Sequence, residues 1–117
     1  MADIASLIEQ LYSDDAKVRR NATFDLIGGG GAVIEPLIPV LKADNPDVRY
    51  AAAVVLDQLK HLVSARLFVD VEAAVQHLAA ARSRLNERSD EDDKFATVLI
   101  RQFLVRIDTE SARNALL

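Results

Sequence analysis

Three clusters in this sequence contain residue types that could carry chemistry. Gly28–Gly31 are four consecutive glycines, whose backbone N–H groups could hold a phosphate before a helix. The acids of Ser89–Asp93 could bind a cation. His61 and His77 could ligate zinc or transfer a proton. Each cluster has to be weighed against a purely structural explanation.

None of these clusters is part of a complete motif. The glycines are not followed by the Lys-Ser/Thr pair of a P-loop and do not follow a strand. The acids lack the glycine and spaced oxygen ligands of an EF-hand, and the histidines belong to no H-E-x-x-H pattern. The chain has no cysteine and no G-x-S-x-G. We therefore expect no catalytic residue, no metal site and no cofactor, and a protein that is not an enzyme.

Structural roles explain the same residues more simply. The glycines are expected to form a flexible loop, because their backbone entropy ends a helix, and the acids to cap a helix N-terminus. The histidines are expected at the surface or satisfied in the core. A basic group near the end of one expected helix is more typical of helix C-terminus stabilisation than of phosphate contact; it comprises Arg82, Arg84 and Arg88.

The stretch Leu37–Leu56 repeats an earlier stretch, Leu7–Leu26, without a gap. Eight of the twenty positions are identical: Leu7/Leu37, Ile8/Ile38, Leu11/Leu41, Asp14/Asp44, Val18/Val48, Arg19/Arg49, Ala22/Ala52 and Leu26/Leu56. A fixed period of thirty residues indicates a repeat array, in which neighbouring units share one core.

Composition narrows the class of protein. Half of the 117 residues are apolar, but only six are aromatic, which suits close helix packing. No apolar run reaches the ~20 residues that span a bilayer, and the start has no basic signal-like region. We expect a cytoplasmic protein with no membrane contact. A net charge of −4 makes nucleic acid an unlikely partner.

Helical spacing of apolar residues predicts an all-α fold. The first helix is expected over about 3–12, a second ends at about 27, and a third begins at about 32 with a bend at Pro39. A fourth is expected from Pro46 through Leu59 toward Leu67, and a fifth begins at Asp70. Apolar residues mark a sixth helix: Phe95, Val98, Leu99, Phe103 and Ile107. Thr109-Glu110 starts a short last helix or a tail. The six successive apolar residues Ala51–Leu56 predict that their helix is central.

In each unit a polar turn, Ser13–Asp15 or Asp44–Pro46, is expected to cap the second helix. A Val-Arg pair lies four residues after the first aspartate of this turn, at Val18-Arg19 after Asp14 and at Val48-Arg49 after Asp44. With two helices per thirty residues, this pattern resembles the HEAT family, especially short bacterial forms similar to those of phycobilisome-lyase-type HEAT proteins. Pro36 fits the family's first-helix proline, whereas Ser6 departs from it. The resemblance implies a right-handed α-solenoid of about three antiparallel helix pairs in a single domain, 1–117. Its repeats are about 3–28, 32–60 and a degenerate 61–108, which forms an atypical C-terminal capping pair, before a terminal helix or tail at 109–117.

The resemblance also implies roles for particular residues. The turn aspartates Asp14 and Asp44 and the basic residues Arg19 and Arg49 are similar to the Asp–Arg ladder that links HEAT repeats, with Arg19 expected to meet Asp44. HEAT second helices line a concave face, where we expect a non-enzymatic scaffold to bind another protein. The expected contact residues are Lys17, Arg20, Phe24, Asp47, Tyr50 and Val54. The apolar members of this set could instead be covered as core.

Comparison of the two copies adds one more expectation. Asn21 and Asp25 of the first unit become Ala51 and Val55 in the second. We expect this flank to face the preceding repeat, which the first unit lacks, so the open flank could also support self-association. Two other functions remain open: a bilin lyase or chaperone, and a nucleic-acid binder resembling HEAT-like DNA glycosylases, whose basic face is here interrupted by Asp47 and Asp57.

Overall fold

The computed structural model describes residues 3–85 and 91–117, and these residues form helices and turns without any strand. The α-helices are α1 (Ile4–Gln10), α2 (Ala16–Gly28), α3 (Ile34–Leu37), α4 (Pro46–Leu59), α5 (Val71–Leu85), α6 (Glu91–Ile107) and α7 (Glu110–Ala115). Four 3₁₀ turns connect them: η1 (Gly30–Val33), η2 (Ile38–Lys42), η3 (Lys60–Leu62) and η4 (Ala65–Leu67).

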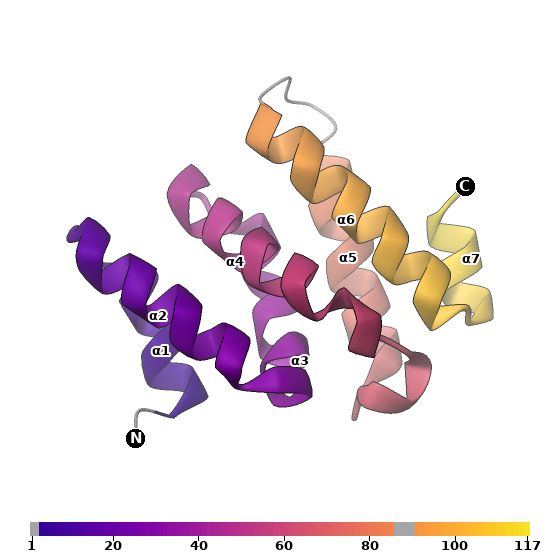
Figure 1. Ribbon diagram of the computed structural model, residues 1–117. Coiled ribbons are helices and arrows are strands. Elements are labelled where there is room, and N and C mark those ends of the chain that lie inside the picture. Colours follow the sequence, from indigo (N-terminus) through magenta and orange to yellow (C-terminus); the bar gives the residue numbers. More distant parts are fainter. Residues whose placement is uncertain (1–2, 86–90) are drawn as a thin grey trace.

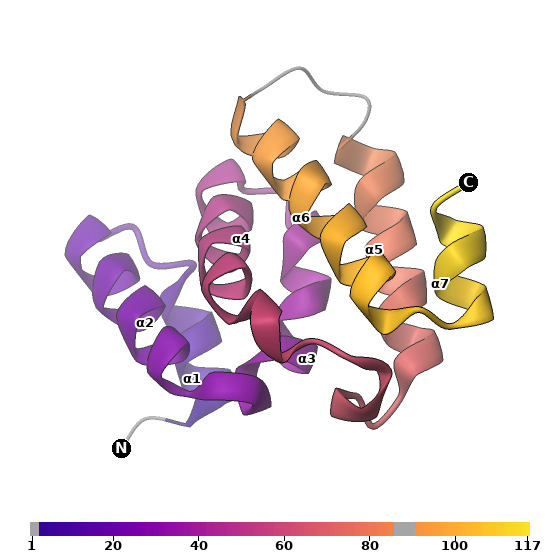
Figure 2. The same cartoon turned by 45° about the vertical axis from the view of Figure 1, so that its right-hand side comes forward.

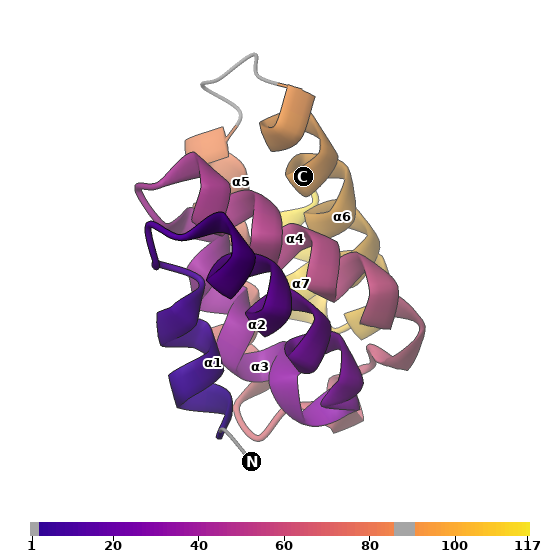
Figure 3. The same cartoon turned by 60° about the vertical axis from the view of Figure 1, so that its left-hand side comes forward.

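The helices form two layers (Figures 1, 2 and 3). The first layer contains α1, then α3 with η2, then α5 and α7. The second layer contains α2, α4 and α6, with α4 in contact with both of its neighbours. This arrangement is consistent with the predicted all-α solenoid. Its right-handed sense, the number of helix pairs and the division into repeats stay predictions.

Side-chain caps start α2 and α4 where the sequence predicts them. The Asp15 carboxylate accepts a hydrogen bond from the Lys17 backbone N–H at 2.9 Å. Asn45 accepts one from the Asp47 N–H at the same distance, and Pro46 takes the first helical position, which needs no N–H donor. The two capping turns are therefore confirmed.

The glycine run ends α2, but it forms a close-packed turn instead of a plain loop. α2 ends at Gly28, and η1 begins two residues later. Gly30 has φ of 65°, a left-handed conformation that favours glycine. A Cβ on Gly29 would lie 2.6 Å from the Cγ1 of Val33, so the backbone itself packs against that side chain. The phosphate-cradle alternative is not needed to explain these glycines.

Pro39 breaks the first helix of the second unit. α3 ends at Leu37, and the chain continues as the 3₁₀ turn η2. A proline inside a helix removes one backbone hydrogen bond and clashes with the preceding turn. The expected bend thus takes the form of a change from α to 3₁₀ geometry.

α4 is the central helix, as predicted. Its buried side chains face α2 on one side and α6 on the other; they are Val48, Arg49, Ala52, Ala53, Val55, Leu56 and Leu59. The expected continuation of this helix to Leu67 is wrong, because α4 ends at Leu59 and gives way to η3 and η4. Between these turns Val63 is extended and buried, so it anchors the connection in the core.

The flank that distinguishes the two copies behaves as predicted. Val55 is fully buried and Ala51 is half-buried, whereas Asn21 and Asp25 are exposed. Since α4 packs against α2 and nothing described precedes α2 in its layer, the flank faces the preceding unit.

Candidate interaction surface

A groove of about 340 Å³ runs between the outer faces of α2 and α4. We call it the α2–α4 groove; it is lined by Arg19, Arg20, Thr23, Phe24, Ile27, Asp47, Tyr50, Ala51 and Val54. Every predicted contact residue except Lys17 lines it, and Lys17 is exposed in the first turn of α2. The helical spacing of the sequence therefore identified side chains that share one surface.

The aromatic side chains of this surface are exposed and are not covered as core. Phe24 is 65% exposed and Tyr50 is 44% exposed, while Val54 is half-buried between them and the core. The Tyr50 ring packs at a tilt of 54° against Phe95 of α6, with 6.1 Å between ring centroids. This contact holds Tyr50 while leaving part of the ring accessible. Large apolar side chains that are exposed on a surface with a polar rim are typical of binding sites.

The charges around the α2–α4 groove are mostly positive. Arg20 and Lys17 are exposed on α2, and Asp47 is exposed at the start of α4. Arg19 is half-buried, and its Nη1 donates to the Ser13 carbonyl at 2.8 Å. Arg19 therefore has a structural bond, whereas Arg20 is directed to solvent.

The expected ladder aspartates lie in the turns between the layers, and the ladder arginines lie near the starts of α2 and α4. Asp14 is exposed in the turn before α2. Asp44 accepts a hydrogen bond from the guanidinium of Arg84 on α5. Like Arg19, Arg49 reaches back to the turn before its own helix, where Nη1 donates to the carbonyls of Ala43 and Asp44 at 2.9 and 3.0 Å. The pairing of Arg19 with Asp44 stays a prediction.

Arg49 also forms a buried ion pair that the sequence did not reveal. Its Nε and Nη2 donate to the two carboxylate oxygens of Asp93 in α6, at 3.2 and 3.4 Å. The two residues are only 2% and 4% exposed. Asp93 was expected merely to belong to a capping cluster. Aligning the first residues of α4 and α6 would have placed Asp93 at the position of the buried Val48, which was the available signal.

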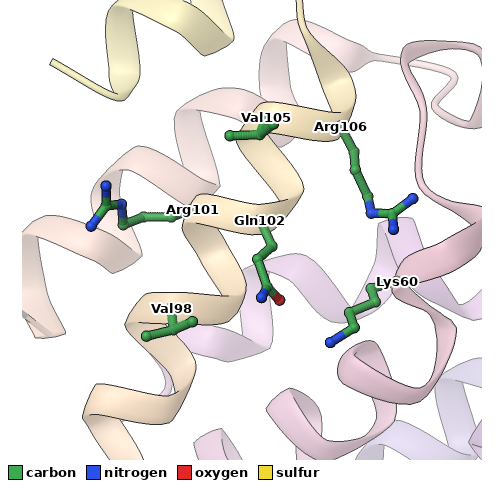
Figure 4. A pocket seen from close by; sticks show the side chains of 6 residues that line it. All are labelled: Lys60, Val98, Arg101, Gln102, Val105 and Arg106. Carbon is green, nitrogen blue, oxygen red and sulfur yellow. The ribbon is translucent and has the colours of Figure 1, made fainter.

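A second hollow, of about 540 Å³, lies over the exposed face of α6 (Figure 4). Lys60, Val98, Arg101, Gln102, Val105 and Arg106 line it. Val98 is 55% exposed and Val105 is 62% exposed. Sequence reasoning used Val98 only to mark a helix and assigned no role to Arg101 or Arg106.

The other chemical candidates have structural contacts or stand alone. Within residues 3–85 and 91–117, no cluster of three or more His, Asp or Glu side chains could hold a metal ion. Arg82 donates to the Ala115 carbonyl and Arg84 to the Lys42 carbonyl, so both tie α5 to neighbouring elements. Arg88, Ser89 and Asp90 lie outside the described residues. No helix in the described part of the chain has the length and apolar character to span a bilayer.

Comparison with known proteins gives one match. No curated protein and no solved structure matches the chain. The family model of HEAT repeats matches residues 4–99, which include both sequence copies and the helices α1 to α5. The match also reaches into α6, and it agrees with the two-layer helical arrangement. The chain therefore belongs to the HEAT-repeat family.

Proposed function

We propose that this protein is a non-enzymatic adaptor that binds a segment of another protein in the α2–α4 groove. The observation that carries the proposal is the exposure of two large aromatic side chains, Phe24 and Tyr50, on one face between charged residues. HEAT repeats generally act as protein-interaction scaffolds. Aromatic and arginine side chains are also the types that most often dominate binding energy at interfaces.

The groove combines apolar side chains with two aromatic rings. Val54 and Ala51 of α4, both half-buried, line the groove together with the more exposed rings of Phe24 on α2 and Tyr50 on α4. A volume of about 340 Å³ is sufficient for a few apolar side chains of a partner. Burial of the aromatic rings would supply most of the affinity, because rings contribute large apolar areas at small entropic cost.

Charge around the groove favours a partner with acidic residues beside its apolar ones. Arg20 and Lys17 are exposed on the α2 side, and Asp47 stands alone on the α4 side. Rim charges of this kind mainly accelerate association and weaken as salt rises. Lys17 and Arg20 would therefore steer the partner, and Asp47 would help to orient it.

A pull-down from lysate of the source cells tests the proposal with a matched pair of variants. Tyr50→Asp places a charge in the groove, whereas Tyr12→Asp makes the same change on a tyrosine of similar exposure, 51%, in the turn after α1. We expect a protein captured by the wild type to be retained by Tyr12→Asp and lost by Tyr50→Asp. Equal capture by the two variants, or capture by none of the three proteins, would contradict the proposal.

A further inference from the structure

The exposed flank of α6 corresponds to a flank that is buried in α4. Counted from the first residue of each helix, Arg49, Ala53 and Leu56 of α4 correspond to Lys94, Val98 and Arg101 of α6. All three residues of α4 are buried, and α6 packs against this helix, with Asp93 of α6 bonded to Arg49. All three residues of α6 are exposed. The flank of α6 that corresponds to the buried flank of α4 is therefore not covered by any described helix.

The two layers end at different points along the solenoid. α7 packs against α5 and α6 and extends the first layer by one helix. It is fixed there by the Arg82 bond to the Ala115 carbonyl, at 2.7 Å, and by bonds from Ser111 to the Glu72 carboxylate. In the described part of the chain, no helix follows α6 in the second layer (Figures 1 and 2).

A second copy of the chain does not fit well at this open side of α6. End-to-end stacking of solenoids would bring α1 of the second copy next to α5, in the first layer. α7 already occupies that position. A single helix from a different protein can pack beside α6 without displacing α7.

The side chains around this place indicate the chemistry of the helix that would fill it. Val98 and Val105 are two helical turns apart and form an apolar stripe along α6. Arg101 and Arg106 lie on opposite sides of this stripe, with Lys60 on the Arg106 side (Figure 4). Among the described residues, neither guanidinium forms an ion pair, whereas the Lys60 Nζ lies 3.0 Å from the Asp57 carboxylate, and no acid lines the hollow. An apolar stripe between cations is complementary to an acidic amphipathic helix.

We propose that α6 docks an acidic amphipathic helix of a partner protein along the Val98–Val105 stripe. The partner's apolar side chains pack on the two valines, and its carboxylates meet Arg101 on one side and Arg106 and Lys60 on the other. Nucleic acid would gain little from the exposed valines and would be repelled by the net charge of −4. This surface is separate from the α2–α4 groove and does not depend on its function.

The test uses the full chain and a phage-displayed library of helix-forming peptides. Peptides selected on the wild type are labelled with a fluorophore, and their binding is measured by anisotropy. We expect the selected peptides to include an acidic amphipathic group whose affinity falls at least about fivefold in Arg101→Glu and in Val98→Asp. The affinity should be unchanged in Arg66→Glu, a matched charge reversal at an exposed arginine on η4, and in Tyr50→Asp.

A compensating change distinguishes direct contact from altered folding. Replacing the peptide's acids by lysines should weaken binding to the wild type and restore part of the binding to Arg101→Glu. The inference is overturned if no selected peptide depends on Val98 and Arg101, or if the dependent peptides are not acidic. It is also overturned if duplex DNA binds this surface more tightly than every selected peptide.

Discussion

Removing the Asp93 carboxylate should strongly destabilise the protein, because this group is the buried partner of Arg49. In Asp93→Asn the Nε and Nη2 groups of Arg49 lose their anionic partner while remaining buried. Breaking a buried ion pair from one side costs about 3–5 kcal/mol, because the remaining charge is uncompensated. Arg49 keeps its two bonds to backbone carbonyls, so we expect the lower end, about 3 kcal/mol.

The assay is urea unfolding followed by circular dichroism, with a double-mutant cycle. Arg49→Met leaves the Asp93 carboxylate buried and should cost a similar amount, roughly 3–5 kcal/mol. The double variant Arg49→Met/Asp93→Asn removes both charges and should be less destabilised than the sum of the single variants by about 1.5–3 kcal/mol. The half-buried pair of Lys60 and Asp57 is the control, and because it remains accessible to solvent, Asp57→Asn should cost less than about 1 kcal/mol.

A small effect would refute this reasoning. If Asp93→Asn costs less than about 1 kcal/mol with an unchanged m-value, the pair is solvated like a surface pair. If the cycle shows no coupling, α4 and α6 are held together by apolar packing alone. Either result would show that the Arg49–Asp93 ion pair is not what links α4 to α6.

Three smaller perturbations test the local structure. Gly30→Ala should cost about 1–2 kcal/mol because φ is 65°, whereas Gly28→Ala, at the open end of α2, should be neutral or stabilise by up to about 1 kcal/mol in the same unfolding assay. Asn45→Ala should cost about 1 kcal/mol through loss of the α4 cap, and the control Asn114→Ala, on α7, should cost less than about 0.5 kcal/mol. The hydrogen bond from the Ser6 backbone N–H lowers the pKa of the Asp3 carboxyl. The α1 cap is therefore fully formed above the ordinary pKa of an aspartate and is lost as the pH falls through the lower folded value. An NMR titration that shows an ordinary pKa for Asp3 would contradict this.

Internal similarity made much of the N-terminal half predictable. The copies at Leu7–Leu26 and Leu37–Leu56 gave the capping turns, the central helix and the contrast between Asp25 and Val55, because a repeat presents the same flank to a changed neighbour. The same spacing placed Phe24 and Tyr50 on one face. These features follow from helical geometry, which depends on local spacing.

The C-terminal half was harder to predict because it leaves the thirty-residue register. No glycine or proline marks the end of α4 at Leu59. The helix ends where the following chain buries Val63 and Phe68 in the core. The partnership of Arg49 with Asp93 joins residues that are far apart in the sequence, and single-sequence periodicity does not report such pairs. The exposure of Val98 depends on which helix lies beside α6, which only the three-dimensional arrangement shows.

The most direct test of the adaptor function is photo-crosslinking in living cells through a benzophenone side chain in place of Phe24. That position projects from α2 at the α2–α4 groove and is 65% exposed, so folding should be preserved. We predict one discrete adduct with another protein, absent when the same probe replaces Tyr12 and lost when Tyr50→Asp is added. An adduct that forms from Tyr12 but not from Phe24, or that survives Tyr50→Asp, would contradict binding at this groove.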